Sequence, residues 1–280
     1  MADFDFTGPV SFPDLEKTVE QAKADAKTSS KEVIRSLVTY IDLTTLAGDD
    51  TRKRVQDLAA RASKPFPNDP SLKCAAVCVY PARIGDVKEK LAELGEQDVK
   101  IASVVGGFPS GQYHLQSRVL ECQLAAEDGA DELDTVINRA AALEGKWKVV
   151  EEEILQMKRA GNGKHLKVIL ATGELKSVEN IYRASLASIL GGADFIKTST
   201  GKESVNATLE AAYVMLEVIK EYYEKTGKKI GFKPAGGIRT VQEALEYVYL
   251  IKIVLGDEWL TPKLFRIGAS SLLDNVLKEL

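Results

Sequence analysis

The chain has 280 residues, of which 45% are hydrophobic, and its formal net charge is −4. This length suits one large α/β barrel or two smaller domains. The negative charge argues against nucleic acid or an anionic membrane as the main partner. With only two histidines and three cysteines in the sequence, we expect neither a metal site built on imidazole nor a disulfide framework.

No targeting or membrane-spanning segment is apparent. The first ten residues, "MADFDFTGPV", contain neither a basic nor an apolar segment of the kind found in secretory signals. The longest obvious apolar run is "CAAVCVY" at 74–80, which is too short to cross a bilayer. We therefore expect a cytoplasmic protein whose thiols are kept reduced.

Short apolar or β-branched runs recur at nearly regular intervals and indicate eight strands. These runs cover residues 37–43, 74–80, 100–108, 132–138, 166–172, 195–201, 231–237 and 265–271. Segments with helical periodicity separate them, such as residues 49–63 and 177–192. Thr240 and Glu243 have the spacing of a capping box at the start of another helix.

Strands that alternate with helices predict parallel βαβ units, and eight such units predict a single (β/α)8 TIM barrel over residues 37–280. Residues 1–36 precede it as an N-terminal helical extension, with a surface helix predicted over residues 14–27. A doubly wound sheet is the alternative architecture. It is disfavoured because no Gly-x-Gly-x-x-Gly motif links a strand to a helix.

Charged residues interrupt several of the predicted strands. Side chains alternate across a strand, so an apolar side chain that faces the helices places its neighbours inside the barrel. A single lysine at a strand end can simply reach solvent, but buried charges need partners. Five inward-facing charged residues on five different strands predict a functional cluster inside the barrel: Asp42, Asp134, Lys167, Lys197 and Lys233.

Paired lysines in a dry site favour Schiff-base chemistry. A free lysine has a pKa of about 10.4, and a second ammonium group nearby favours the neutral form of the first. A neutral amine forms a Schiff base with an aldehyde or ketone, which acts as an electron sink for cleavage of a carbon–carbon bond. Asp134 could move the protons that this reaction requires.

The loops after the seventh and eighth strands predict a phosphate site. Gly236 and Gly237 allow close approach of backbone N–H groups, while Ser270 and Ser271 stand where the last helix begins. Ordinary turn glycines and a capping serine are the alternative interpretation. The Gly201-Lys202 pair could add a third side, but the segment around it does not fit a nucleotide-binding P-loop.

Five segments resemble signature segments of the deoxyribose-phosphate aldolase family: "IDLTTL", "GADELDTVIN", "DFIKTSTGK", "GFKPAGGIRT" and "RIGASSLL". The similarity extends from about Ile41 to Leu273. It implies a class I aldolase, without metal or cofactor, that cleaves 2-deoxy-D-ribose 5-phosphate to D-glyceraldehyde 3-phosphate and acetaldehyde. We also expect a homodimer or homotetramer.

The resemblance assigns roles to residues that strand alternation already placed inside the barrel. Lys197 matches the family's Schiff-base lysine, Lys233 matches its second lysine, and Asp134 matches its proton-relaying aspartate. Three residues match neighbours of the reacting carbons: Asp42, Lys167 and Thr200.

Two further residues gain an interpretation from the resemblance. Lys202 is expected near the substrate, and Cys78 matches a barrel cysteine that unsaturated aldehydes can attack. From the sequence alone, Cys78 would be a small core residue. The chain departs from some members of the family in having no tyrosine after Tyr249, where those members carry a C-terminal tyrosine that helps proton transfer.

Two other functions fit the same sequence features. One is a Schiff-base enzyme of the same fold that acts on a different phosphorylated sugar. The other is a catalytically silent protein that only binds sugar phosphates, which is disfavoured because Lys197, Lys233 and Asp134 are all present.

Overall fold

Eight parallel strands form the centre of the computed structural model, which describes residue 4 and residues 6–280. They are β1 (Ile41–Thr44), β2 (Ala76–Val79), β3 (Lys100–Val105), β4 (Glu132–Val136), β5 (His165–Ile169), β6 (Phe195–Lys197), β7 (Gly231–Lys233) and β8 (Ile267–Ala269). They pair in the order β7-β6-β5-β4-β3-β2-β1-β8. Parallel bridges between Phe232 and Phe265 and between Ala235 and Gly268 close the barrel.

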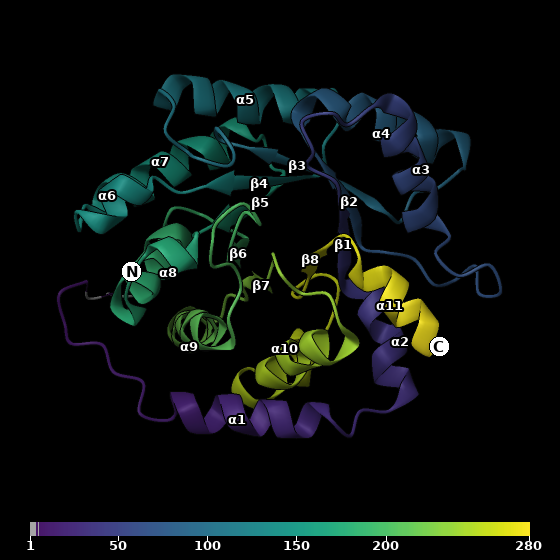
Figure 1. Ribbon diagram of the computed structural model, residues 1–280. Coiled ribbons are helices and arrows are strands. Elements are labelled where there is room, and N and C mark those ends of the chain that lie inside the picture. Colours follow the sequence, from purple (N-terminus) through teal and green to yellow (C-terminus); the bar gives the residue numbers. More distant parts are fainter. Residues whose placement is uncertain (1–3, 5) are drawn as a thin grey trace.

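Helices surround the strands as an outer ring (Figure 1). After the first strand these are α3 (Arg52–Ser63), α4 (Ile84–Glu93), α5 (Leu115–Asp128), α6 (Arg139–Leu143), α7 (Trp147–Ala160), α8 (Val178–Leu190), α9 (Leu209–Thr226), α10 (Val241–Val254) and α11 (Leu272–Glu279). Short 3₁₀ turns are η1 (Pro81–Arg83), η2 (Thr172–Glu174) and η3 (Asp257–Trp259). The predicted TIM barrel is therefore confirmed, and so is the capping box at the start of α10.

One predicted strand begins later than expected. Residues 37–40 belong to helix α2 (Lys31–Tyr40), and β1 starts at Ile41. The side chain of Ser30 caps this helix by accepting a hydrogen bond from the backbone N–H of Val33. The apolar run "LVTY" thus includes the buried face of the last helical turn, and short apolar runs of this kind suit either structure.

The N-terminal region packs closely on the barrel. Helix α1 (Leu15–Ala26) contacts α10 and α9, and Figure 1 shows it lying across that side of the ring. It buries Val19, Ala22 and Ala26. The predicted boundary between residues 36 and 37 falls inside helix α2. The division of the chain into an extension of residues 1–36 and a barrel of residues 37–280 stays a prediction. Residues 1–3 and 5 of that extension lie outside the described residues.

The side chains of the barrel strands divide as alternation predicts. Ile41, Val168, Ile196 and Phe232 join the hydrophobic core between the strands and helices. Inside the barrel, β2 and β3 contribute a separate small apolar cluster of Ala76, Cys78, Ala102 and Val104. The remaining strands supply the buried charges described below, so the interior has an apolar side and a charged side.

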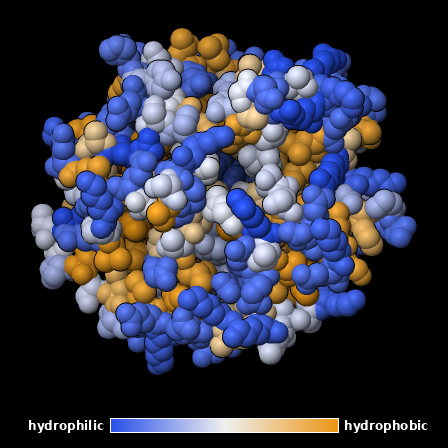
Figure 2. Space-filling model, in the orientation of Figure 1, coloured by the Kyte–Doolittle hydropathy of each residue, from blue (hydrophilic) through white to orange (hydrophobic). Residues whose placement is uncertain are grey.

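No helix in the described part of the chain is long and apolar enough to cross a membrane. Figure 2 shows a hollow near the centre of the face seen in Figure 1, surrounded largely by hydrophilic residues.

Candidate active site

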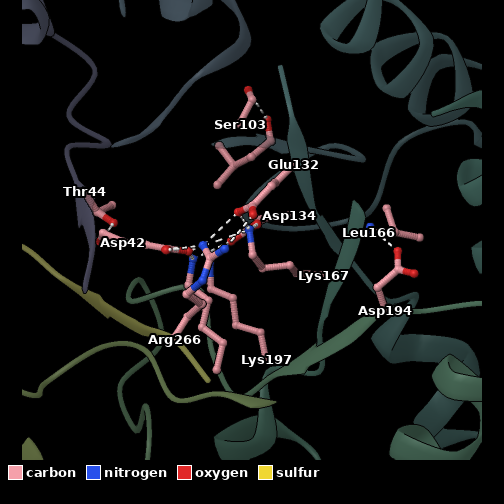
Figure 3. Close-up of polar contacts among 12 residues, drawn as sticks. Asp42, Thr44, Ser103, Glu132, Asp134, Leu166, Lys167, Asp194, Lys197 and Arg266 are labelled. Carbon is pink, nitrogen blue, oxygen red and sulfur yellow. Dashed lines mark hydrogen bonds and ion pairs between the residues drawn. The ribbon is translucent and has the colours of Figure 1, made fainter. Parts of the chain in front are cut away.

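Asp134 on β4 is the centre of the buried charges. Its Oδ2 atom accepts hydrogen bonds from the Nζ atoms of Lys197 and Lys233, each at 2.8 Å. Its Oδ1 atom accepts one from Lys167 Nζ at 3.0 Å. Figure 3 shows Asp134, Lys167 and Lys197 pointing toward one another from different strands. All four side chains are buried, so the structure brings together the residues that alternation predicted.

Asp42 on β1 joins the same network from the opposite side. Its Oδ2 atom lies 2.5 Å from Lys233 Nζ and 3.6 Å from Lys167 Nζ. Lys233 therefore lies between two carboxylates, those of Asp42 and Asp134. Because every charge has a partner of opposite sign, the network can remain buried at a tolerable cost.

Two members of the network were missed in the sequence. Glu132 accepts from Lys167 Nζ at 2.5 Å and from Arg266 Nη2 at 2.7 Å. Arg266 also donates from Nη1 to Asp42 Oδ1 at 2.8 Å. Alternation could have found both, because Glu132 stands two residues before Asp134 and Arg266 directly precedes the core residue Ile267.

The pKa values of the three lysines are shifted in different directions. Burial lowers the pKa of Lys197, and the positive charge of Lys233 lowers it further, so that the attraction of Asp134 does not restore the usual value. Burial alone would also lower the pKa of Lys233, but the carboxylates of Asp134 and Asp42 outweigh it and raise that pKa. Lys167 behaves like Lys233, with Asp134 and Glu132 as its main partners. Lys197 is therefore the lysine that most readily becomes a neutral amine.

Cys78 lies inside the barrel on the apolar side. It is fully buried beside Ala76, Ala102 and Val104, and Leu46, Tyr80 and Phe108 pack against this cluster. Burial raises the pKa of its thiol, which favours the less nucleophilic protonated form. Its reactivity toward unsaturated aldehydes stays a prediction.

A cavity of about 400 Å³ connects Lys197 to the predicted phosphate loops. The predicted residues among those that line it are Thr200, Gly201, Lys202, Gly236, Gly237, Ser270 and Ser271. Gly236 and Gly237 adopt φ angles of 86° and 87°, a left-handed conformation that favours glycine. Arg239 also lines this cavity, and its place in "GGIRT", directly after the two glycines and Ile238, is the sequence feature that indicates it.

The loop between β6 and α9 is held by groups within it and by neighbouring loops. Both carboxylate oxygens of Glu203 accept from the backbone N–H of Thr200, at 3.1 and 3.0 Å. Lys202 Nζ donates to the carbonyl of Leu46, after β1, at 2.9 Å. Arg139 Nη1 lies 3.8 Å from Glu203. Glu203 and Arg139 were not among the predicted site residues, because the sequence around them does not show which loops they contact.

A larger cavity, of about 650 Å³, lies between residues 8–14 and helices α8 and α9. Its lining contains none of the buried charges of the barrel interior. The smaller cavity is therefore the better candidate for the active site, because Lys197 and the predicted phosphate loops both line it.

The eight parallel strands form a closed barrel with buried lysines inside it and a cavity at the carboxyl ends of the strands. These features define the class of (β/α)8 enzymes. Within that class, the chain belongs to the DeoC/LacD family of aldolases, whose model matches residues 36–278. The resemblance found in the sequence is thereby confirmed.

Individual relatives are similar over most of their length. The deoxyribose-phosphate aldolase of Homo sapiens is 48% identical over 284 residues, which is 97% of this chain and 89% of the human protein. That of Mus musculus is 52% identical over 252 residues, or 87% and 79% of the two chains. A solved structure of the tetrameric deoxyribose phosphate aldolase from Aeropyrum pernix has a TM-score of 0.69 and 25% identity, covering 94% of this chain and 97% of that one.

Proposed function

We propose that the protein cleaves 2-deoxy-D-ribose 5-phosphate to D-glyceraldehyde 3-phosphate and acetaldehyde through a Schiff base on Lys197. This is deoxyribose-phosphate aldolase activity, a carbon–carbon lyase reaction of deoxyribose phosphate catabolism. One observation carries the proposal: a buried lysine with a lowered pKa opens into a cavity. Gly236, Gly237, Ser270 and Ser271 line the same cavity, and we propose that they bind the phosphate group of the substrate.

The chemistry follows from the arrangement of the charges. The neutral amine of Lys197 attacks the C1 aldehyde, and loss of water gives the Schiff base. The C2–C3 bond then breaks, with its electron pair drawn toward the iminium nitrogen while the C3 hydroxyl loses its proton. Protonation of C2 and hydrolysis release acetaldehyde and restore Lys197.

Asp134 and Lys233 have the contacts needed to move these protons. Asp134 is hydrogen-bonded to both lysines, and the neighbouring cations, Lys167 foremost, overcome burial and keep its pKa well below the usual value. It therefore remains a carboxylate that can relay a proton between them. Lys233, whose pKa is raised, serves as the proton donor. Asp42 and Lys167 hold this pair in place.

We propose the location, the partners and the oligomeric state of the protein from three further observations. The three cysteines are buried and unpaired, which suits the reducing cytoplasm. A small phosphorylated sugar is the expected partner, in preference to nucleic acid or a membrane. The relative from Aeropyrum pernix is tetrameric, and we propose a homodimer or homotetramer for this chain as well.

Borohydride reduction in the presence of acetaldehyde, followed by peptide mapping, tests the proposal. We expect the label on Lys197 and no label in Lys197→Leu, with the fold of that variant intact by circular dichroism. Lys202→Leu serves as the control and should still be labelled at Lys197. A label on Lys233 or Lys202 of the wild-type protein, or a wild-type protein that releases no acetaldehyde from the substrate, would contradict the proposal.

A further inference from the structure

We infer that Arg266 and Glu132 are positioning residues that set the net charge of the barrel interior and so keep the amine of Lys197 neutral. This inference rests on the proposed role of Lys197 as the Schiff-base lysine. Neither residue lies within hydrogen-bond distance of Lys197 among the described contacts. Both act on it through the charges between them.

Arg266 is fixed by contacts at each of its guanidinium nitrogens. Nη1 donates to Asp42 Oδ1 at 2.8 Å and to Glu132 Oε2 at 3.0 Å, and Nη2 donates to Glu132 Oε1 at 2.7 Å. Nε donates to the carbonyl of Pro262. The side chain is only 6% exposed. An arginine held in this way contributes a permanent positive charge that cannot be released as a proton.

The network is layered along the barrel axis. Arg266 directly precedes β8, where Gly268 pairs with Asp42, so it enters on the amino-terminal side of Asp42. Glu132 likewise stands one side-chain repeat before Asp134 on β4. The two residues therefore form a layer nearer the amino-terminal ends of the strands than Lys197. Asp42, Lys167 and Asp134 connect this layer to Lys197 (Figure 3).

Counting charges by strand shows that the interior carries one cation in excess. The strands and their ends contribute Asp42 from β1, Glu132 and Asp134 from β4, Lys167 from β5, Lys197 from β6, Lys233 from β7 and Arg266 from β8. From β2 comes the Cys78 thiol, which is neutral because burial raises its pKa, and from β3 the uncharged Ser103. Four cations thus face three carboxylates, and loss of one proton balances them.

Lys197 is the cation from which that proton leaves. Among the described residues its only ion-pair partner is Asp134. Lys233 pairs with two carboxylates and Lys167 with three. The proton is therefore lost from the lysine with the fewest carboxylate partners, because its removal gives up the least electrostatic attraction to carboxylates.

The charge count predicts shifts of opposite sign for the two residues. Arg266→Gln removes the excess cation, so Lys197 should keep its proton to higher pH. Glu132→Gln adds to the positive excess, so Lys197 should lose its proton at lower pH. The double variant returns the interior to one excess cation, and the two effects should largely cancel. Damage to packing alone would not produce such a pattern.

The experiment measures the rate of borohydride trapping by acetaldehyde as a function of pH. Acetaldehyde carries no phosphate, so the result does not depend on the phosphate loops. We expect the acidic midpoint to rise by about one pH unit in Arg266→Gln and to fall by about one unit in Glu132→Gln. It should return to near the wild-type value in the double variant and remain there in Arg266→Lys, which keeps the charge.

Arg118→Met provides a matched control, because Arg118 is also buried and pairs with Glu153 outside the barrel interior. Its midpoint should equal that of the wild type. If Arg266→Gln does not fold, as judged by circular dichroism, Glu132→Gln and the double variant still carry the test. Midpoints that do not move, or that move in the same direction for both charges, overturn the inference. A wild-type protein that is not labelled at Lys197 refutes the proposed function instead.

Discussion

Three lysine side chains lie inside the barrel, and their surroundings shift their pKa values in different directions. In the part of the chain that the structure describes, Lys167 and Lys233 each pair with more than one carboxylate, whereas Lys197 pairs with Asp134 alone. The number of nearby carboxylates agrees with the direction of each pKa shift, which is downward for Lys197, the nucleophile that we propose, and upward for the other two.

Replacing Lys233 by Leu should impair catalysis and shift its pH dependence. The positive charge of Lys233 lowers the pKa of Lys197, so its removal should raise that pKa and move the acidic limb of the kcat profile to higher pH. The proton donor is lost as well, and we expect kcat at neutral pH to fall by about 100-fold or more. Steady-state kinetics from pH 5 to pH 10 would measure both effects.

Lys228→Leu is the control for this experiment, because Lys228 precedes β7 but is exposed. Its profile should match that of the wild type. An acidic limb that stays in place in Lys233→Leu would show that the two lysines are not coupled.

Ser270→Asp should remove most of the preference for a phosphorylated substrate. The substitution places a carboxylate beside the start of α11, where we expect the phosphate to accept charge-assisted hydrogen bonds worth about 1.5–3 kcal/mol each. We expect kcat/KM for deoxyribose 5-phosphate to fall by about 100-fold, while cleavage of free deoxyribose and trapping of acetaldehyde change little. Comparative kinetics with the two sugars would measure the preference.

Ser204→Asp offers the matched control, since Ser204 is exposed in the loop after β6 and does not line the cavity. It should keep the preference for the phosphorylated sugar. Full preference in Ser270→Asp would instead direct attention to Gly201 and Lys202 as the phosphate-binding turn.

Loops and terminal helices contribute at the scale of whole elements. Arg139 at the start of α6 donates to the carbonyls of Pro109 and Ser110 and pairs with Glu174. It thereby ties the loops that follow β3, β4 and β5 at the carboxyl end of the barrel. Helix α1 connects elements on the outside of the barrel in the same way, because it packs against both α9 and α10.

Ala22→Asp should destabilise the protein because it places a charge in the contact between α1 and the barrel. Ala22 is fully buried on this helix, whereas Ala24, two residues later, is exposed. An uncompensated buried charge costs about 3–5 kcal/mol, and we expect the free energy of unfolding to fall by about that amount in a urea titration. Ala24→Asp should change it by less than about 0.5 kcal/mol. Equal stability of the two variants would show that α1 is not needed by the barrel.

The buried carboxylates make the stability of the whole molecule sensitive to acid. Burial acts to raise the pKa of Asp42, Glu132 and Asp134, but the surrounding cations outweigh it and hold all three pKa values below normal. A lowered pKa in the folded state adds stability above the pKa of the unfolded chain, about 4, and that stability is lost as the pH falls.

We therefore expect the free energy of unfolding to be highest near neutral pH and to fall steeply below about pH 4. Urea titrations at pH 7, 5, 4 and 3 would measure it. Little change between pH 5 and pH 3 would show that the network contributes no net stability to the fold.

The sequence by itself determined much of this protein. Eight short apolar runs separated by helical segments predicted the barrel. Alternation along the strands placed Asp42, Asp134, Lys167, Lys197 and Lys233 inside it, because the direction of a side chain on a strand depends only on its position along that strand. The predicted phosphate loops were chosen because they follow particular strands of a known architecture, and they line the same cavity as Lys197.

Only the tertiary structure decided which charges pair and which lysine is left with one partner. Arg266 and Asp42 are far apart in the chain and meet only because β8 pairs with β1. The helical form of residues 37–40 likewise depends on packing, since α2 contacts α10 and α11 and buries Leu37, Val38 and Tyr40. Side-chain direction is a local property of the backbone, whereas hydrogen-bond partners and burial depend on how distant segments come together.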